Sequence, residues 1–186
     1  VQRVVAERWK SATGVPIVES YGLTEASPGV SSNRLDIEDW TGTIGMPLPS
    51  TDAVILDEND AEAPVGQFGE ICIRGPQVMM GYWNRPEETA AMFTPDGWLR
   101  TGDMGYIDPQ GAFRITDRKK DMIVVSGFKV CPNQVADVVA MHPGVAEVGA
   151  IGVADERSGE AVKIVVVRKD AGLTEQALLD IARARD

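Results

Sequence analysis

The sequence predicts an α+β protein with a β-rich first part and a smaller mixed second part. From Gly42 onward, short apolar segments are separated by Gly, Pro, Asp and Asn, which is typical of a small β-barrel or β-rich subdomain. A charge cluster at residues 117–121 separates two apolar strands. Beyond it, strand-like and helix-like segments alternate. The cluster is therefore the expected boundary, although such a cluster is also typical of a solvated turn.

In the first part, residues 1–12 have helical apolar spacing, and Gly14 ends that pattern. A short strand follows at 15–21 and runs into a loop. In a later strand, Ile71 and Ile73 alternate onto one face. The same reasoning predicts, in order, strands at 53–56 and 69–75, a short helix at 85–93 and a hairpin formed by 98–108 and 113–116.

The second part is expected to begin with a strand at 122–125. A helix at 134–141 follows, with Asn133 as its N-cap after Pro132. The remaining elements are predicted as strands at 146–153 and 161–168 and a helix at 174–185.

Composition excludes several classes of function. The chain has 18 basic and 28 acidic residues, so its net charge of −10 disfavours a nucleic-acid partner. Its two cysteines form no CxxC pattern, which indicates a reducing compartment. A single histidine, His142, leaves zinc sites and Ser-His-Asp chemistry without their parts. No apolar run approaches the ~20 residues of a membrane span.

The segment 21–25 combines residue types that suit a nucleotide. The Tyr21 ring can stack on a purine, and the Thr24 hydroxyl can donate to a phosphate oxygen. Glu25 offers a hard oxygen ligand for Mg²⁺, and Gly22 allows close approach of the backbone. Residue types alone favour an ordinary strand–loop junction over a nucleotide site.

Four later residues have the same ambiguity. Asp103 could accept from two adjacent ribose hydroxyls, or could form an Asx turn. Arg118 could bind a ribose oxygen or a phosphate. Gly127 could admit a thin ligand, and Lys129 could meet a phosphate. Each residue taken alone is undistinguished.

Together these residues form a recognisable series. Residues 96–120 (DGWLRTGDMGYIDPQGAFRITDRKK) resemble the fatty-acyl-CoA synthetase signature of the adenylate-forming superfamily, which also holds luciferases and adenylation domains of peptide synthetases. The other motifs stand in the family's order, and the resemblance covers essentially the whole chain. These motifs are 21–25 (YGLTE), 42–45 (GTIG), 69–75 (GEICIRG), 81–83 (GYW) and 126–127 (SG). The chain looks most like bacterial long-chain fatty-acid CoA ligases.

The resemblance implies a division of the chain. Residues 1–117 would be the end of the large N-terminal domain with a distorted β-barrel subdomain, 118–121 the hinge, and 122–186 a partial α+β C-terminal domain. The family's phosphate loop would lie upstream of Val1 and its catalytic lysine downstream of Asp186. Both ends therefore look cut, and we expect this fragment alone to be inactive.

The resemblance also implies roles for the nucleotide-site residues. The family activates a carboxylate with ATP to an acyl-adenylate and then transfers the acyl group to CoA. Tyr21 and Gly22 would line the ATP or AMP site with the ring along the adenine, Thr24 would touch the α-phosphate, and Glu25 would bind Mg²⁺. Asp103 would accept from the ribose hydroxyls, supported by Arg118.

On the side of the second domain, the resemblance makes Lys120 the hinge residue. Gly127 would lie beside the pantetheine of CoA, and Lys129 would help to bind phosphate. The implied substrates are a fatty acid, ATP and CoA, with Mg²⁺ as cofactor. The implied location is cytoplasmic; peripheral association of the parent enzyme with the inner membrane, and its oligomeric state, stay open.

Three alternatives remain at this level. One keeps adenylation but changes the acid or the acceptor, as in a luciferase-like enzyme or a carrier-protein ligase. The second is a non-catalytic module in which the same motifs serve only the fold. The third is a plain β-rich domain in which the motifs are coincidental.

Overall fold

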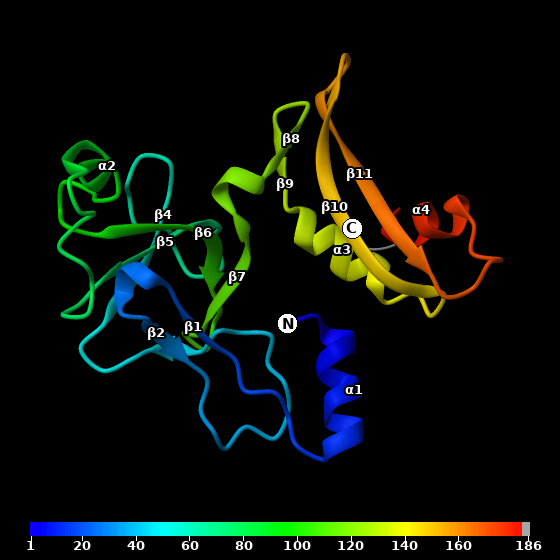
Figure 1. Cartoon of the computed structure of the whole chain (residues 1–186), viewed down its shortest axis with the longest axis horizontal. Coiled ribbons are helices and arrows are strands. Elements are labelled where there is room, and N and C mark those ends of the chain that lie inside the picture. Colours follow the sequence, from blue (N-terminus) through cyan, green and yellow to red (C-terminus); the bar gives the residue numbers. More distant parts are fainter. Residues whose placement is uncertain (184–186) are drawn as a thin grey trace. The chain divides into compact units, whose positions relative to one another are not determined.

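The computed structural model describes residues 1–183, and its contacts divide the chain into two compact units. The first unit comprises Val1 with Val5–Ile115, and the second comprises Gln2–Val4 with the chain from Thr116 onward. Within the described residues there are four α-helices and three β-sheets (Figure 1). The expected α+β class is confirmed.

The first unit contains helix α1 (Arg3–Thr13) from Val5 onward and a small antiparallel sheet in the order β1-β2-β3. Its strands are β1 (Ser20–Gly22), β2 (Gly29–Ser32) and β3 (Met46–Pro47). A 3₁₀ turn, η1 (Thr24–Ala26), connects β1 to β2. The strand expected at 15–21 is therefore reduced to its end, since Pro16 offers no amide to a sheet.

A four-stranded antiparallel sheet in the order β4-β5-β6-β7 carries most of the first unit's core. Its strands are β4 (Asp52–Leu56), β5 (Gly69–Arg74), β6 (Leu99–Ile107) and β7 (Phe113–Arg118). Ile55, Ile71, Ile73 and Leu99 are at most 1% exposed. Residues 69–73 of β5 are all buried, so burial on this strand does not alternate with the side chains.

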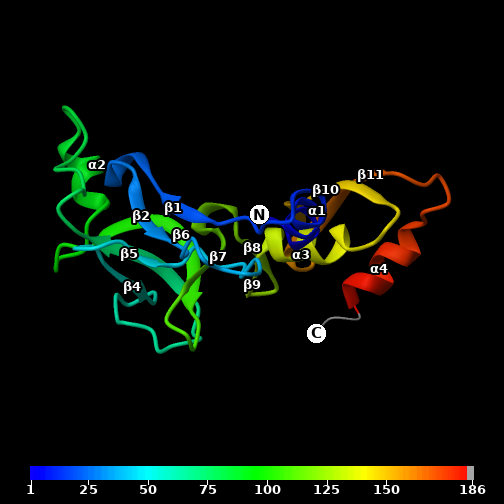
Figure 2. The same cartoon turned by 90° about the horizontal axis from the view of Figure 1, so that it is seen from below.

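A closed barrel is not seen in residues 1–183. The strands of the first unit form two open sheets, which a single bridge between Gly45 and Phe113 connects. β3 has only two residues, one of them Pro47, which cannot donate a ladder hydrogen bond. Figure 2 shows β1 and β2 as a ribbon distinct from the sheet that contains β4 and β5. The short helix α2 (Pro86–Ala91) lies in the β5–β6 connection.

The second unit contains a four-stranded antiparallel sheet in the order β10-β11-β8-β9 and two helices. Val139, Val145 and Leu173 form its buried cluster. No helix in the described part of the chain is long and apolar enough to cross a bilayer. The elements, after the 3₁₀ turn η2 (Lys119–Asp121), are β8 (Ile123–Val125), β9 (Phe128–Val130), α3 (Pro132–Ala140), β10 (Val145–Asp155), β11 (Gly159–Arg168) and α4 (Glu175–Arg183).

The start of α3 corrects the expected N-cap. Cys131, not Asn133, is the N-cap residue, and Pro132 occupies the first turn, where its fixed φ favours a helix. One free backbone amide is bonded from elsewhere: Asp117 Oδ2 accepts from the Asn133 backbone nitrogen at 2.9 Å, and Asp117 Oδ1 also accepts from the side-chain nitrogen Asn133 Nδ2 at 3.1 Å. A buried carboxylate on β7 thus replaces the local cap.

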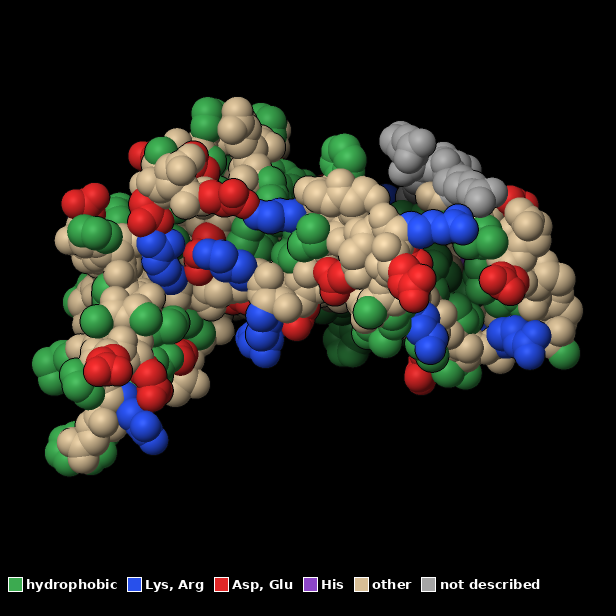
Figure 3. All heavy atoms as spheres, turned by 90° about the horizontal axis from the view of Figure 1, so that it is seen from above, with side chains coloured by type: hydrophobic (Ala, Val, Ile, Leu, Met, Phe, Trp, Pro, Cys, Tyr) green, Lys and Arg blue, Asp and Glu red, His purple; other side chains and the backbone are tan. Residues whose placement is uncertain are grey.

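Charge is mixed on the face of the molecule shown in Figure 3. Acidic and basic side chains are interspersed there with apolar ones.

Candidate functional site

The structure brings together two residues that the sequence assigns to one nucleotide. The Tyr21 hydroxyl on β1 donates to Asp103 Oδ2 on β6 at 2.6 Å, although the residues are 82 positions apart. Asp103 is 7% exposed, and Tyr21 is half-buried against the apolar core. The aromatic ring and the carboxylate therefore belong to one place, where the two sheets of the first unit meet.

A bulge in β6 presents Asp103. Glu70 pairs with Met104 but Cys72 pairs with Arg100, so β6 has two more residues than β5 across this interval. Side chains supply bonds where the ladder is interrupted: Thr101 Oγ1 donates to the Ile71 carbonyl at 2.7 Å and accepts from the Asp103 amide at 3.1 Å. Gly102 has φ +73, a conformation that favours glycine.

Thr24 and Glu25 lie in η1, directly after β1. Thr24 is exposed and Glu25 is half-buried. The Tyr82 hydroxyl donates to Glu25 Oε1 at 2.6 Å, and the Met79 amide donates to the Glu25 carbonyl at 2.7 Å. This hydrogen bond from Tyr82 to Glu25 raises the pKa of the Tyr82 phenol, and partial burial adds to the shift. The carboxylate is held, with its backbone, by the segment that precedes α2.

Glu25 fits the kind of magnesium site that the sequence implies. The described residues contain no group of three or more His, Cys, Asp and Glu side chains that could hold a metal. Mg²⁺ usually binds one or two carboxylates together with substrate phosphates rather than an all-protein cage. One positioned carboxylate next to Thr24, the threonine expected to touch the α-phosphate, suits that pattern.

Gly22 has a structural role that is visible in the fold. A Cβ at this position would lie 2.0 Å from the Pro28 carbonyl oxygen, because the chain turns back tightly after η1. The Leu23 amide donates to that same carbonyl at 2.9 Å. Glycine is therefore required to close this turn, whatever it contributes to a ligand.

The other candidate residues belong to the second unit. Arg118 ends β7, and Lys120 lies in η2; both are exposed. Ser126 and Gly127 have φ +51 and +86, so they form the two-residue turn between β8 and β9. Lys129 is exposed on β9.

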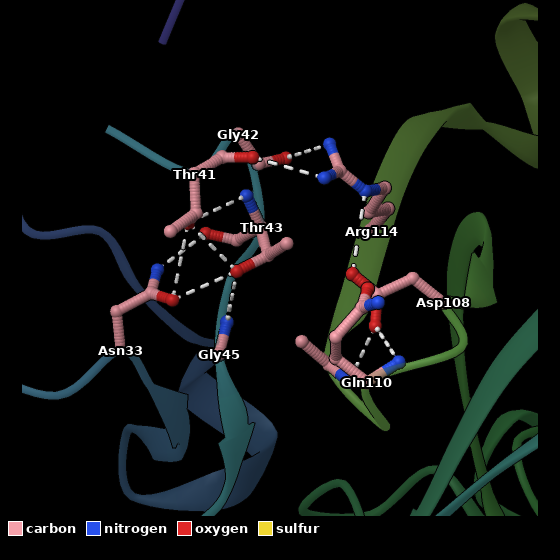
Figure 4. Close-up of polar contacts among 9 residues, drawn as sticks. Asn33, Thr41, Gly42, Thr43, Gly45, Asp108, Gln110 and Arg114 are labelled. Atoms are coloured by element: carbon pink, nitrogen blue, oxygen red, sulfur yellow. Dashed lines mark hydrogen bonds and ion pairs between the residues drawn. The ribbon is translucent and has the colours of Figure 1, made fainter. Parts of the chain in front are cut away.

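A polar network supports the loop between β2 and β3 (Figure 4). Thr43 Oγ1 donates to Asn33 Oδ1 at 2.7 Å. Arg114 of β7 donates to the carbonyls of Gly42 and Thr41 at 3.2 and 3.0 Å, and its Nε lies 3.6 Å from Asp108 Oδ2. The network fastens the loop beside the Gly45–Phe113 bridge, so it stabilises the junction of the two sheets.

Sequence reasoning missed two residues around this site. Tyr82 was recognised only as part of a motif, and Glu70 only as part of a strand and a motif. One signal was available for Glu70, because it is a charged residue next to the apolar run 71–73 of that strand. Nothing local marks Tyr82, since its partner Glu25 is 57 positions away.

Known proteins resemble this chain in both sequence and fold. The profile of the AMP-binding enzyme family matches residues 1–83, and that of the AMP-binding enzyme C-terminal domain matches residues 134–185. A long-chain-fatty-acid–CoA ligase of Escherichia coli O6:H1 is 56% identical over 98% of this chain and 32% of its own length. The chain thus spans about a third of the length of such curated relatives.

Solved structures show the same relationship. ATP-bound MatB from Rhodopseudomonas palustris has a TM-score of 0.92 and 37% identity, covering 98% of this chain and 37% of that one. The o-succinylbenzoate CoA synthetase of Bacillus subtilis, in complex with its acyl-adenylate intermediate, has a TM-score of 0.87 and 31% identity over all of this chain and 38% of its own. The chain therefore belongs to the adenylate-forming family of AMP-binding enzymes.

Proposed function

We propose that the whole protein is an ATP-dependent long-chain fatty-acid–CoA ligase. A fatty-acid carboxylate attacks the α-phosphate of ATP, giving an acyl-adenylate and pyrophosphate. The CoA thiol then attacks the acyl carbon, giving the thioester and releasing AMP. The observation that carries the proposal is the 2.6 Å contact between Tyr21 and Asp103, because it joins an aromatic ring and a sugar-binding acid at one place. The 56% identity to a fatty-acid ligase supports the acyl substrate.

The nucleoside would be held by three side chains. The Tyr21 ring lies along the adenine and provides apolar contact area. Gly22, which has no side chain, allows the backbone beside the ring to approach the nucleotide closely. Asp103, oriented by the Tyr21 hydroxyl, accepts hydrogen bonds from the ribose hydroxyls. Arg118 would support the ribose with its planar guanidinium.

The phosphate end would use Thr24 and Glu25. Thr24 donates from its hydroxyl to an α-phosphate oxygen, where negative charge accumulates during attack. Glu25 supplies a carboxylate oxygen to Mg²⁺, and the ion neutralises charge on the phosphates. The hydrogen bond from Tyr82 leaves the other Glu25 oxygen, Oε2, for this contact. No side-chain nucleophile is needed in either half-reaction.

The thioester-forming step would use residues of the second unit. Lys120, exposed in η2, is the hinge residue at which a backbone rotation exchanges the two half-reactions. Gly127, in its tight turn, lies beside the pantetheine of CoA, and Lys129 helps to bind phosphate. This assigns residues 1–117 to the large domain, 118–121 to the hinge and 122–186 to the C-terminal domain.

Further features of the parent enzyme follow as part of the same proposal. The two open sheets of the first unit would belong to a distorted barrel of the large domain. The enzyme would act in the cytoplasm, with peripheral docking at the inner membrane to collect fatty acids. No observation favours a luciferase-like enzyme, a carrier-protein ligase or a non-catalytic module over this ligase.

The proposal is tested with the full-length protein. We expect ATP, oleate, CoA and Mg²⁺ to yield oleoyl-CoA, with pyrophosphate release that depends on the fatty acid. Arg118→Ala should raise the KM for ATP, whereas Arg157→Ala, which changes a residue of the β10–β11 turn, should leave it unchanged. Absence of fatty-acid-dependent pyrophosphate release from the folded, full-length protein would refute the proposed activity.

A further inference from the structure

Glu70 is a buried carboxylate to which the proposed reaction gives no role. It lies on the central strand β5, and its side chain is 6% exposed. A charged group is retained in such a place only when it is paired and hydrogen-bonded. Its partners therefore indicate what it does.

Those partners belong to the bulge of β6. Glu70 Oε1 accepts from the Gly102 amide at 3.0 Å, and Glu70 Oε2 lies 3.6 Å from Arg100 Nη1. Arg100 is fixed in turn by Asp60, whose two oxygens accept from its Nη2 at 2.6 and 2.7 Å. Glu70 thus contacts β6 at two positions: Gly102, the residue directly before Asp103, and Arg100, three residues before Asp103.

The bonds at the bulge determine where Asp103 points. The two extra residues of β6 interrupt the ladder opposite β5, so the amide of Gly102 would otherwise lack its strand partner. Glu70 satisfies that amide, and the Thr101 hydroxyl satisfies the Asp103 amide. Gly102, at φ +73, depends on these neighbours to hold one conformation.

We propose that Glu70 is a positioning residue for nucleotide binding, which holds the β6 bulge in the conformation that presents Asp103 to the ribose hydroxyls. This inference rests on the proposed function, because it presupposes a ribose at Asp103. Glu70 touches no substrate: it acts through the Gly102 amide. Its removal should therefore weaken recognition of the sugar hydroxyls more than binding of the rest of the nucleotide.

The test is calorimetric binding of AMP and of 2′,3′-dideoxy-AMP to the full-length protein. The measured quantity is the ratio of the two Kd values, which isolates the contribution of the ribose hydroxyls. In the wild type we expect AMP to bind about tenfold to a hundredfold more tightly, the range for hydrogen bonds to a charged acceptor. Glu70→Met has a similar length but no carboxylate oxygen, and it should bring the ratio close to one.

Glu70→Gln is the matched control, since its amide oxygen can still accept from Gly102, and it should keep most of the ratio. If Glu70→Met does not fold, Glu70→Asp, which withdraws the acceptor by one methylene, should reduce the ratio in the same way. A folded Glu70→Met or Glu70→Asp with the wild-type ratio would overturn the inference and leave the proposed function standing. A wild type that binds both nucleotides equally would overturn the ribose assignment and this inference together.

Discussion

Replacing Tyr21 by Phe tests the contact on which the site is built. The change removes one hydroxyl and keeps the ring, so the packing against the core of the first unit is preserved. The lost hydrogen bond is short, at 2.6 Å, and its acceptor Asp103 is only 7% exposed, so water can replace it only in part. A hydrogen bond to a charged group contributes about 1.5–3 kcal/mol.

We therefore expect Tyr21→Phe to lower the free energy of unfolding by about 1.5–3 kcal/mol, measured by urea denaturation with an unchanged m-value. AMP affinity of the full-length protein should fall by about tenfold, because the carboxylate loses its orientation while the ring still stacks. Tyr106→Phe is the matched control. It removes the same hydroxyl from a tyrosine on β6, the strand that carries Asp103, but leaves the Tyr21–Asp103 pair intact. Tyr21→Phe with the stability and AMP affinity of the wild type would refute the reasoning.

Three further predictions concern other parts of the structure. Tyr82→Phe removes the hydroxyl that orients Glu25, so it should raise severalfold the Mg²⁺ concentration needed for half-maximal activity. Little stability should be lost, because Tyr82 is exposed. An unchanged Mg²⁺ dependence would contradict this prediction. Burial raises the pKa of the Cys131 thiol, so iodoacetamide at pH 8 should alkylate it more slowly in the folded than in the unfolded chain, and equal rates would count against burial. Hydrogen bonds from Ser158 and the Arg157 amide lower the pKa of Asp155 below its usual range. Its stabilisation of the β10–β11 turn is therefore present at neutral pH and is lost as the pH falls through the folded-state pKa. Asp155→Ala should speed amide exchange in the hairpin at pH 7, by a factor that shrinks on acidification, and an acceleration independent of pH would argue against the charge.

Local pattern was sufficient for most elements of the fold. The helix at the N-terminus, the hairpin of β6 and β7 and the long strands β10 and β11 were predictable from apolar spacing and turn residues. The three short strands β2, β3 and β9 were not, because strands of two to four residues are defined by their partners rather than by a period.

Contacts between distant residues account for the remaining differences. Asn133 looked like an N-cap because the local sequence favours it there. In the structure, Asp117 on strand β7 accepts from the backbone amide of Asn133 instead. The buried second face of β5 and the absence of a closed barrel in residues 1–183 likewise depend on which strands become neighbours. Periodicity within one segment contains no information on that choice.

The candidate site was likewise predictable only in part from the sequence. Residue types and motif order assigned Tyr21, Glu25 and Asp103 to a nucleotide, but their hydrogen-bond partners appear only in three dimensions. The bulge that presents Asp103 has a partial sequence signal in Gly102. The carboxylate of Glu70, on a different strand, could be connected with it only after the register of β5 and β6 was known.

Binding of AMP to the Asp103→Asn variant of the full-length protein tests the central assignment most directly. The variant keeps the shape of the side chain but loses its charge and one acceptor oxygen. The account predicts an AMP affinity at least about tenfold below that of the wild type, with little change for 2′,3′-dideoxy-AMP. A folded Asp103→Asn protein that binds AMP as tightly as the wild type would contradict it.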